Sequence, residues 1–119
     1  MIYFISGHRD LTISEFVQHY VPRINAAIKD GASFVVGDYT GADYYAQIFL
    51  SRFPRAKAII YHMGNAPMHV IEGFELKGGF KTDEERDAAM TKISGADIAW
   101  VRRGKEDSGT AQNINRRLK

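Results

Sequence analysis

The sequence contains no cysteine, only three prolines and no long hydrophobic run. Without cysteine the chain forms no disulfide, binds no metal through thiolates and has no cysteine nucleophile. Its apolar runs are far shorter than the about 20 residues that a membrane-spanning helix needs. No basic stretch precedes the first apolar run, as it would in a signal peptide. We therefore expect a cytoplasmic protein with no membrane association.

A strong net charge is also missing. The chain has 16 basic and 14 acidic residues, a formal net charge of +2, so charge alone gives no reason to expect nucleic acid as a partner. Its 119 residues predict one domain, residues 1–119. An apolar content of 45% and a charged content of 25% are typical of a globular protein with one core.

Short apolar runs alternate along the chain with segments of helical periodicity. The runs predict buried strands at residues 2–5, 33–36, 58–61 and 96–101. Capping residues predict helix starts at Thr12, Thr40, Thr82 and Ser108. This alternation predicts an α/β protein: a single Rossmann-like three-layer sandwich with a parallel sheet of four or five strands.

Two segments depart from the simple alternation. Pro22 interrupts the first helical pattern, which predicts a kink or two joined helices near Val21. Residues 63–81 are rich in glycine and have no clear period. We expect them to form a long loop, and such loops in compact domains often act as lids or binding loops.

Polar or glycine-rich groups follow each predicted strand. They are Ser6-Gly7-His8-Arg9, Gly37-Asp38, His62 and the segment 102–109. The ends of parallel strands share one edge of the sheet, and ligands of open α/β sheets bind there. The sequence therefore predicts that these segments, which are remote from one another along the chain, converge on one cleft.

Two of these groups suit a phosphate. Arg9 can donate two parallel hydrogen bonds to an anion, and the alternative is a plain turn with Arg9 paired to Asp10 or to water. Ser108-Gly109-Thr110 begins a helix, where free backbone N–H groups attract anions. The alternative there is simple N-capping by Ser108.

Carboxylates near the same edge suit a sugar or an acid–base step. Asp38 and Asp43 follow the second strand, and the alternative role of Asp43 is to cap the helix. Arg86 and Asp87 lie in the first turns of the third helix, where the alternative is a surface ion pair. The four histidines do not have the spacing of metal ligands, so we expect neither a metal nor a cofactor.

The segments "ISGHRD", "GDYTGAD", "RDAAM" and "ADIAWVRRGKEDSGT" resemble the SLOG superfamily of Rossmann-like domains, and in particular its small bacterial and phage members. That superfamily includes the lonely-guy phosphoribohydrolases, which cleave the N-glycosidic bond of nucleoside monophosphates, and the DNA-processing protein A domain. The first strand and turn, "IYFISG", also look like those of the nucleoside 2-deoxyribosyltransferases. The resemblance spans nearly the whole chain.

This resemblance implies a nucleotide ligand and assigns loops to it. Ser6 and Gly7 match the first phosphate or ribose loop, residues 41–43 match the second, and residues 108–110 match the glycine-threonine phosphate motif. The chain departs from the pattern at Asn113, where the phosphoribohydrolases have a catalytic glutamate. It departs again at Glu106-Asp107, which replaces their double glycine.

We favour an enzyme that cleaves or transfers the N-glycosidic bond of a nucleoside monophosphate, with Asp43 or Asp87 as the catalytic carboxylate. The alternative is a non-catalytic module that senses a nucleotide or nucleotide signal, and a third hypothesis is single-stranded DNA binding. We expect a small-molecule ligand and a homo-oligomer. The expected substrate- or phosphate-binding residues are Ser6, Gly7, His8, Arg9, Gly37, Asp38, Gly41, Ala42, Arg86, Arg102, Ser108, Gly109, Thr110 and Asn113.

Overall fold

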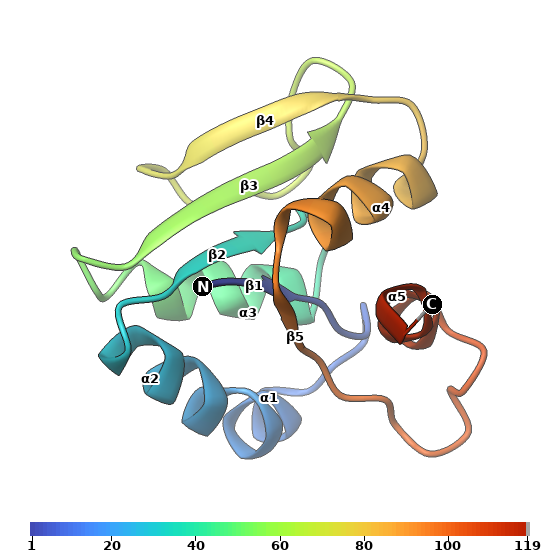
Figure 1. Ribbon diagram of the computed structural model, residues 1–119, viewed down its shortest axis with the longest axis horizontal. Coiled ribbons are helices and arrows are strands. Elements are labelled where there is room, and N and C mark those ends of the chain that lie inside the picture. The colour runs from blue at the N-terminus through green and yellow to red at the C-terminus, as the bar shows by residue number, and fades with distance from the viewer. Residues whose placement is uncertain (119) are drawn as a thin grey trace.

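A computed structural model describes residues 1–118 as five helices around one sheet of five parallel strands (Figure 1). The order across the sheet is β4-β3-β2-β1-β5, and every neighbouring pair is parallel. The predicted α/β, Rossmann-like class is confirmed. The strands are β1 (Ile2–Ile5), β2 (Ser33–Val36), β3 (Lys57–Met63), β4 (Glu75–Phe80) and β5 (Ala96–Ile98).

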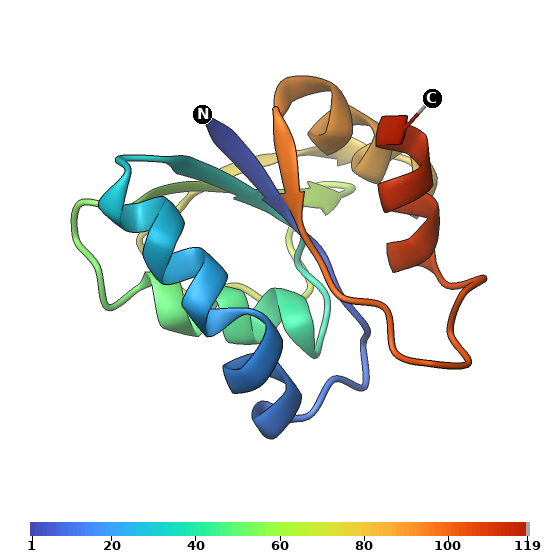
Figure 2. The ribbon, with the colours of Figure 1, turned by 60° about the horizontal axis from the view of Figure 1, so that its bottom comes forward.

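Helices cover both faces of the sheet (Figure 2). One face packs against α1 (Ile13–His19), α2 (Val21–Lys29) and α3 (Ala42–Leu50) in the larger apolar core. On the other face, Met90 of α4 (Asp83–Ile93) packs against Phe4, Val35 and Tyr61. The last helix, α5 (Gly109–Leu118), lies beside α4. Among residues 1–118, no helix combines the length and the apolar character needed to cross a bilayer.

The first helical region begins and breaks where the sequence predicts. Thr12 and Glu15 form a reciprocal capping box, with Glu15 N–H 3.1 Å from Thr12 Oγ1 and Thr12 N–H 2.9 Å from Glu15 Oε1. Tyr20 separates α1 from α2, and Pro22 lies in the first turn of α2, where its missing N–H costs no hydrogen bond.

Tyr20 at this break joins two strand ends. Its side chain is fully buried, its hydroxyl donates to the Ser6 carbonyl at 2.8 Å, and it accepts from the Trp100 N–H at 3.1 Å. Ser6 follows β1 and Trp100 follows β5, so one side chain from the helical layer fixes both segments. Trp100, predicted to lie inside a strand, instead stacks on His19 just after β5, with ring centroids 4.0 Å apart.

The expectation of a long loop over residues 63–81 is wrong for its second half, because Glu75–Phe80 forms β4. As an edge strand exposed along nearly its whole length, β4 has neither a buried apolar run nor an alternating pattern to reveal it. Its glycines also weaken the strand signal. Gly78 is nevertheless required there, since a Cβ at this position would overlap the His62 ring.

Candidate functional site

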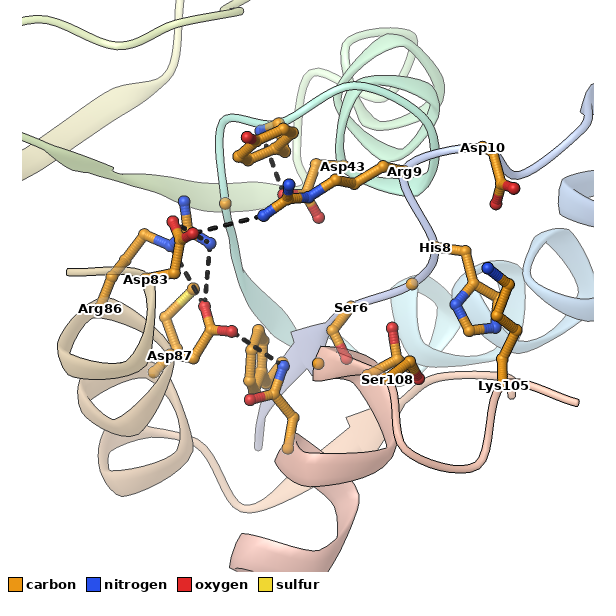
Figure 3. A pocket seen from close by; sticks show the side chains of 18 residues that line it. Ser6, His8, Arg9, Asp10, Asp43, Asp83, Arg86, Asp87, Lys105 and Ser108 are labelled. Atoms are coloured by element: carbon orange, nitrogen blue, oxygen red, sulfur yellow. Dashed lines mark hydrogen bonds and ion pairs between the residues drawn. The ribbon is translucent and has the colours of Figure 1, made fainter. Parts of the chain in front are cut away.

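A cavity of about 470 Å³ lies at the carboxyl ends of β1 and β2, between these strands and the starts of α4 and α5 (Figure 3). This is within the range of small-molecule sites. The predicted convergence is present for the segments after β1, β2 and β5, whereas His62 lies within β3 and does not line the cavity. The expected site residues that line the cavity are Ser6, Gly7, His8, Arg9, Gly37, Asp43, Arg86, Asp87, Ser108, Gly109, Thr110 and Asn113.

Asp43 is the most deeply placed carboxylate of the cavity. Only 9% of its surface is exposed, and one oxygen, Oδ2, accepts the Tyr39 N–H at 3.2 Å. Burial raises the pKa of Asp43 to about 7, although the Arg86 charge opposes the shift. Gly37 makes this placement possible, because a Cβ there would collide with the Asp43 carboxylate. Near neutral pH this group can give or take a proton.

Asp87 lies in the same cavity in a different environment. Its Oδ1 accepts from Arg86 at 3.1 Å and its Oδ2 accepts from Asn113 Nδ2 at 3.1 Å. Asn113 Oδ1 accepts in turn from Arg116 Nη1, which fixes which end of the amide faces Asp87. Asn113, which stands where the resemblance implies an acid, therefore has a role of its own. It donates a hydrogen bond from α5 that orients the Asp87 carboxylate.

Arg86 is the centre of the acidic cluster. Its guanidinium lies 3.0 Å from Asp38, 3.1 Å from Asp87 and 3.5 Å from Asp83. Burial opposes its charge, but the Asp87 and Asp43 carboxylates hold the pKa of Arg86 above its usual value. A permanently charged group therefore stands between the carboxylates and keeps them together.

Asp38, expected to bind substrate, does not line the cavity. Its carboxylate is buried against Arg86, with 7% and 6% of the two side chains exposed, and its Oδ2 accepts the Met68 N–H at 2.7 Å. Because both oxygens are used inside the protein, Asp38 anchors Arg86 and the loop that follows β3.

Gly41 and Ala42 also lie behind the cavity wall. Gly41 has a φ of 72° and packs against the carbonyl oxygens of His8 and Arg9, a position that only glycine fills without strain. The Ala42 N–H donates to the His8 carbonyl at 3.2 Å. These two residues hold the first loop in shape instead of facing the cavity.

Arg102 turns away from the cavity, contrary to expectation. Its guanidinium donates to Glu15 at 2.7 Å and 3.0 Å and to Asp10 at 3.1 Å. Hydrogen bonds from Arg102 lower the pKa of Glu15 to about 2. The Arg102 N–H donates to His8 Nε2 at 2.9 Å, which leaves the ring proton of a neutral His8 on Nδ1. Burial, with the Arg102 charge, lowers the pKa of His8.

The start of α5 has the features of an anion site. Ser108 Oγ accepts the Ala111 N–H at 3.2 Å, while the N–H groups of Gly109 and Thr110 have no acceptor within the described residues. Ser6, which lines the cavity from the end of β1, is 6% exposed, and its buried hydroxyl has no partner in that part of the chain. A helix start and an unpaired buried hydroxyl both suit a bound anion.

Arg9 and Tyr39 form the opposite wall. The Arg9 guanidinium lies 3.7 Å from the centre of the Tyr39 ring and 3.3 Å from Asp83 (Figure 3). Both members of the Arg9–Asp83 pair are largely exposed, at 59% and 43% of their side chains. This wall offers a planar surface on which an aromatic ring can stack.

Sequence reasoning missed some residues that line the cavity: Phe4, Asp10, Tyr39, Asp83, Met90 and Lys105. Phe4 and Met90 belong to the core on the α4 face, so their pattern indicates packing residues. Asp83 is the first residue of α4, where an acid is explained by the helix dipole alone. Lys105 lies in the segment 102–109 that follows the last predicted strand, but Arg102 lies in the same segment and turns away from the cavity.

Comparison with known proteins finds no match among family models, curated proteins or solved structures. In residues 1–118, no group of three or more acidic or histidine side chains is arranged to hold a metal ion.

Proposed function

We propose that the protein cleaves the N-glycosidic bond of a nucleoside 5′-monophosphate. The observation that carries the proposal is the pairing, in one cavity, of two carboxyls in unlike environments. Asp43 is buried with a pKa of about 7, and both oxygens of Asp87 accept hydrogen bonds. Two acids whose environments differ in this way can divide acid and base roles between them.

The anion site at the start of α5 would hold the 5′-phosphate. Gly109 and Thr110 supply backbone N–H groups, Ser6 supplies a hydroxyl, and Lys105 supplies a charge. Among the cavity cations in residues 1–118, Arg9 and Arg86 are paired with carboxylates, whereas Lys105 has no ion pair. Binding the phosphate at this end directs the sugar towards Asp87 and the base towards Arg9 and Tyr39.

The reaction would break the bond between C1′ and the base nitrogen. Positive charge that develops on the sugar is stabilised by the Asp87 carboxylate. Protonated Asp43 gives its proton to the departing base. Water then adds its oxygen to C1′ and returns a proton to Asp43, so the products are the free base and the pentose 5-phosphate. The resemblance of the loops to the SLOG superfamily supports the same substrate class.

Asn113 favours a second candidate, a module that binds a nucleotide without cleaving it. It stands where the resemblance puts a catalytic glutamate, and an amide is neither a nucleophile nor a base at neutral pH. One experiment separates the two. The protein is incubated with AMP, GMP, CMP, UMP and their 2′-deoxy forms, and released base is measured by chromatography. Release of base supports the enzyme, whereas a thermal shift without release supports the binding module.

Lys105→Ala should raise KM for the nucleotide about tenfold and leave kcat nearly unchanged, because the lost charge contacts a phosphate that does not react. Steady-state kinetics with the best nucleotide of the panel measure this. Arg103→Ala is the matched control, since Arg103 is exposed nearby in the same loop and does not line the cavity. Equal effects of the two substitutions would contradict the phosphate assignment.

Asp43→Asn should flatten the dependence of stability on pH. Its carboxyl has a pKa of about 7 when folded and about 3.9 when unfolded, so the folded state binds the extra proton between these values. Wild-type stability therefore falls as pH rises from about 4 to about 7, by up to roughly 4 kcal/mol. Urea unfolding at pH 5 and pH 8 measures the difference. Asp107→Asn, at an exposed position, should keep the wild-type slope, and an unchanged slope in Asp43→Asn would refute the prediction.

A further inference from the structure

The two edges of the sheet differ in how far other parts of the chain cover them. At the β5 edge, Arg23 donates from Nη1 to the Ala99 carbonyl and from Nη2 to the Asp97 carbonyl, each at 2.9 Å. Arg117 also holds the Asp97 side chain, at 2.9 Å and 3.0 Å. Long basic side chains thus occupy the outer side of this strand, which is one way that proteins prevent a sheet edge from pairing.

The β4 edge has no such cover within the described residues. β4 is the outermost strand, and no helix or further strand lies beyond it in Figure 1. Its first five residues are exposed, including Leu76, with 45% of its surface accessible. The strand has no proline, and its pairing with β3 keeps a regular register from Glu75 to Lys77. Beyond Lys77 the register shifts, and Gly79 there has a φ of 93°. The open stretch of residues 75–77 is a template for another strand.

We propose that β4 pairs in antiparallel fashion with β4 of a second copy of this chain, about a twofold axis at Leu76. In that register Glu75 of each copy lies directly opposite Lys77 of the other. Glu75 and Lys77 are on the same face of the strand, since alternate residues share a face. Opposite charges directly across a strand pair stabilise it.

The backbone disfavours the parallel alternative. In a parallel pair, each residue whose N–H and C=O face the partner lies opposite a residue whose own groups face away, so the same edge of two copies cannot pair in register. On the other face, the antiparallel register sets the two Leu76 side chains against each other and covers an apolar group that is now half-exposed. A closed twofold dimer follows, because the edge of each copy is used once and no free β4 edge is left.

This interface is small and independent of the cavity. Strands β3 and β2 separate β4 from β1, so neither Glu75 nor Lys77 is near the proposed nucleotide site. A single paired strand buries less surface than a standard stable interface. We therefore expect a reversible dimer whose population rises with concentration, and nucleotide cleavage that is the same in monomer and dimer.

Sedimentation velocity of the full chain over a wide concentration range tests the proposal. The wild type should dimerise, while Glu75→Lys alone and Lys77→Glu alone should each weaken self-association tenfold or more. An equimolar mixture of the two single variants should form a heterodimer, and the double variant E75K/K77E should dimerise like the wild type. Lys29→Glu, a charge change of the same size at an exposed position of α2, should have no effect.

Three outcomes would overturn the proposal: a wild type that stays monomeric at every concentration, single variants that dimerise as well as wild type, or a double variant that does not recover. Circular dichroism of each variant verifies that the fold is retained. Because charge reversal within the pair restores what each single change removes, a loss of folding cannot imitate the expected pattern.

Discussion

Asp87→Ala lowers the rate of base release by at least about a thousandfold, with little change in KM. This is the expected result if Asp87 stabilises charge that exists only in the transition state, because removing such a group lowers kcat and kcat/KM together. Single-turnover measurements with the preferred nucleotide, followed by chromatography of the free base, give the rate directly.

Two further variants sharpen the assignment to Asp87. Asn113→Ala keeps the carboxylate but removes the donor at 3.1 Å that orients it, so it should lose much less rate than Asp87→Ala. Asp107→Ala, an exposed acid before α5, should behave as wild type. If Asp87→Ala releases base as fast as the wild type, the catalytic carboxylate is a different group and the role proposed for Asp87 is wrong.

Arg86→Met destabilises the protein by about 3–5 kcal/mol. The methionine fills similar space but leaves Asp38 buried with no countercharge, and an unpaired buried charge has a cost of this size. Urea unfolding at pH 7 measures the loss. Asp38→Asn added to Arg86→Met should recover part of the stability, because the uncompensated carboxylate is then removed.

The matched control for Arg86 is Arg9→Ala. Arg9 also pairs with a carboxylate in the cavity, at 3.3 Å, but both partners are largely exposed. Such pairs contribute little, so a loss below about 1 kcal/mol is expected. Similar losses for the Arg9 and Arg86 variants would mean that burial does not set the strength of these ion pairs.

Much of the fold could be predicted from local patterns. Short apolar runs indicate the buried parallel strands, and the capping residues Thr12, Thr82 and Ser108 mark real helix starts with the hydrogen bonds expected of them. The break before Pro22 follows from its missing N–H. β4 could not be predicted, because its partners on one side and its solvent exposure on the other depend on tertiary placement alone.

The candidate site could be predicted only as a set of loops. Parallel topology alone predicts that the strand ends converge. It does not predict which side chains of each loop point into the cavity. Arg102 and Lys105 are similar by sequence, yet Glu15 and Asp10 draw Arg102 outward and leave Lys105 in the cavity. Asp38 and Asp43 are also similar by sequence, but only Asp43 lines the cavity. Asp38 is held outside it by an ion pair with Arg86, which lies 48 residues away in sequence.

One wall of the cavity is held in place by the helical layer that contains α1 and α2. The hydroxyl of Tyr20 ties the segment after β1 to the segment after β5, and the ring that carries it belongs to the break between α1 and α2. Ser6 lines the cavity whereas Trp100 does not, so Tyr20 fixes the position of one cavity wall relative to the segment after β5. A partner that separated α1 from α2 would shift this wall, so helices that do not line the cavity can influence the proposed chemistry.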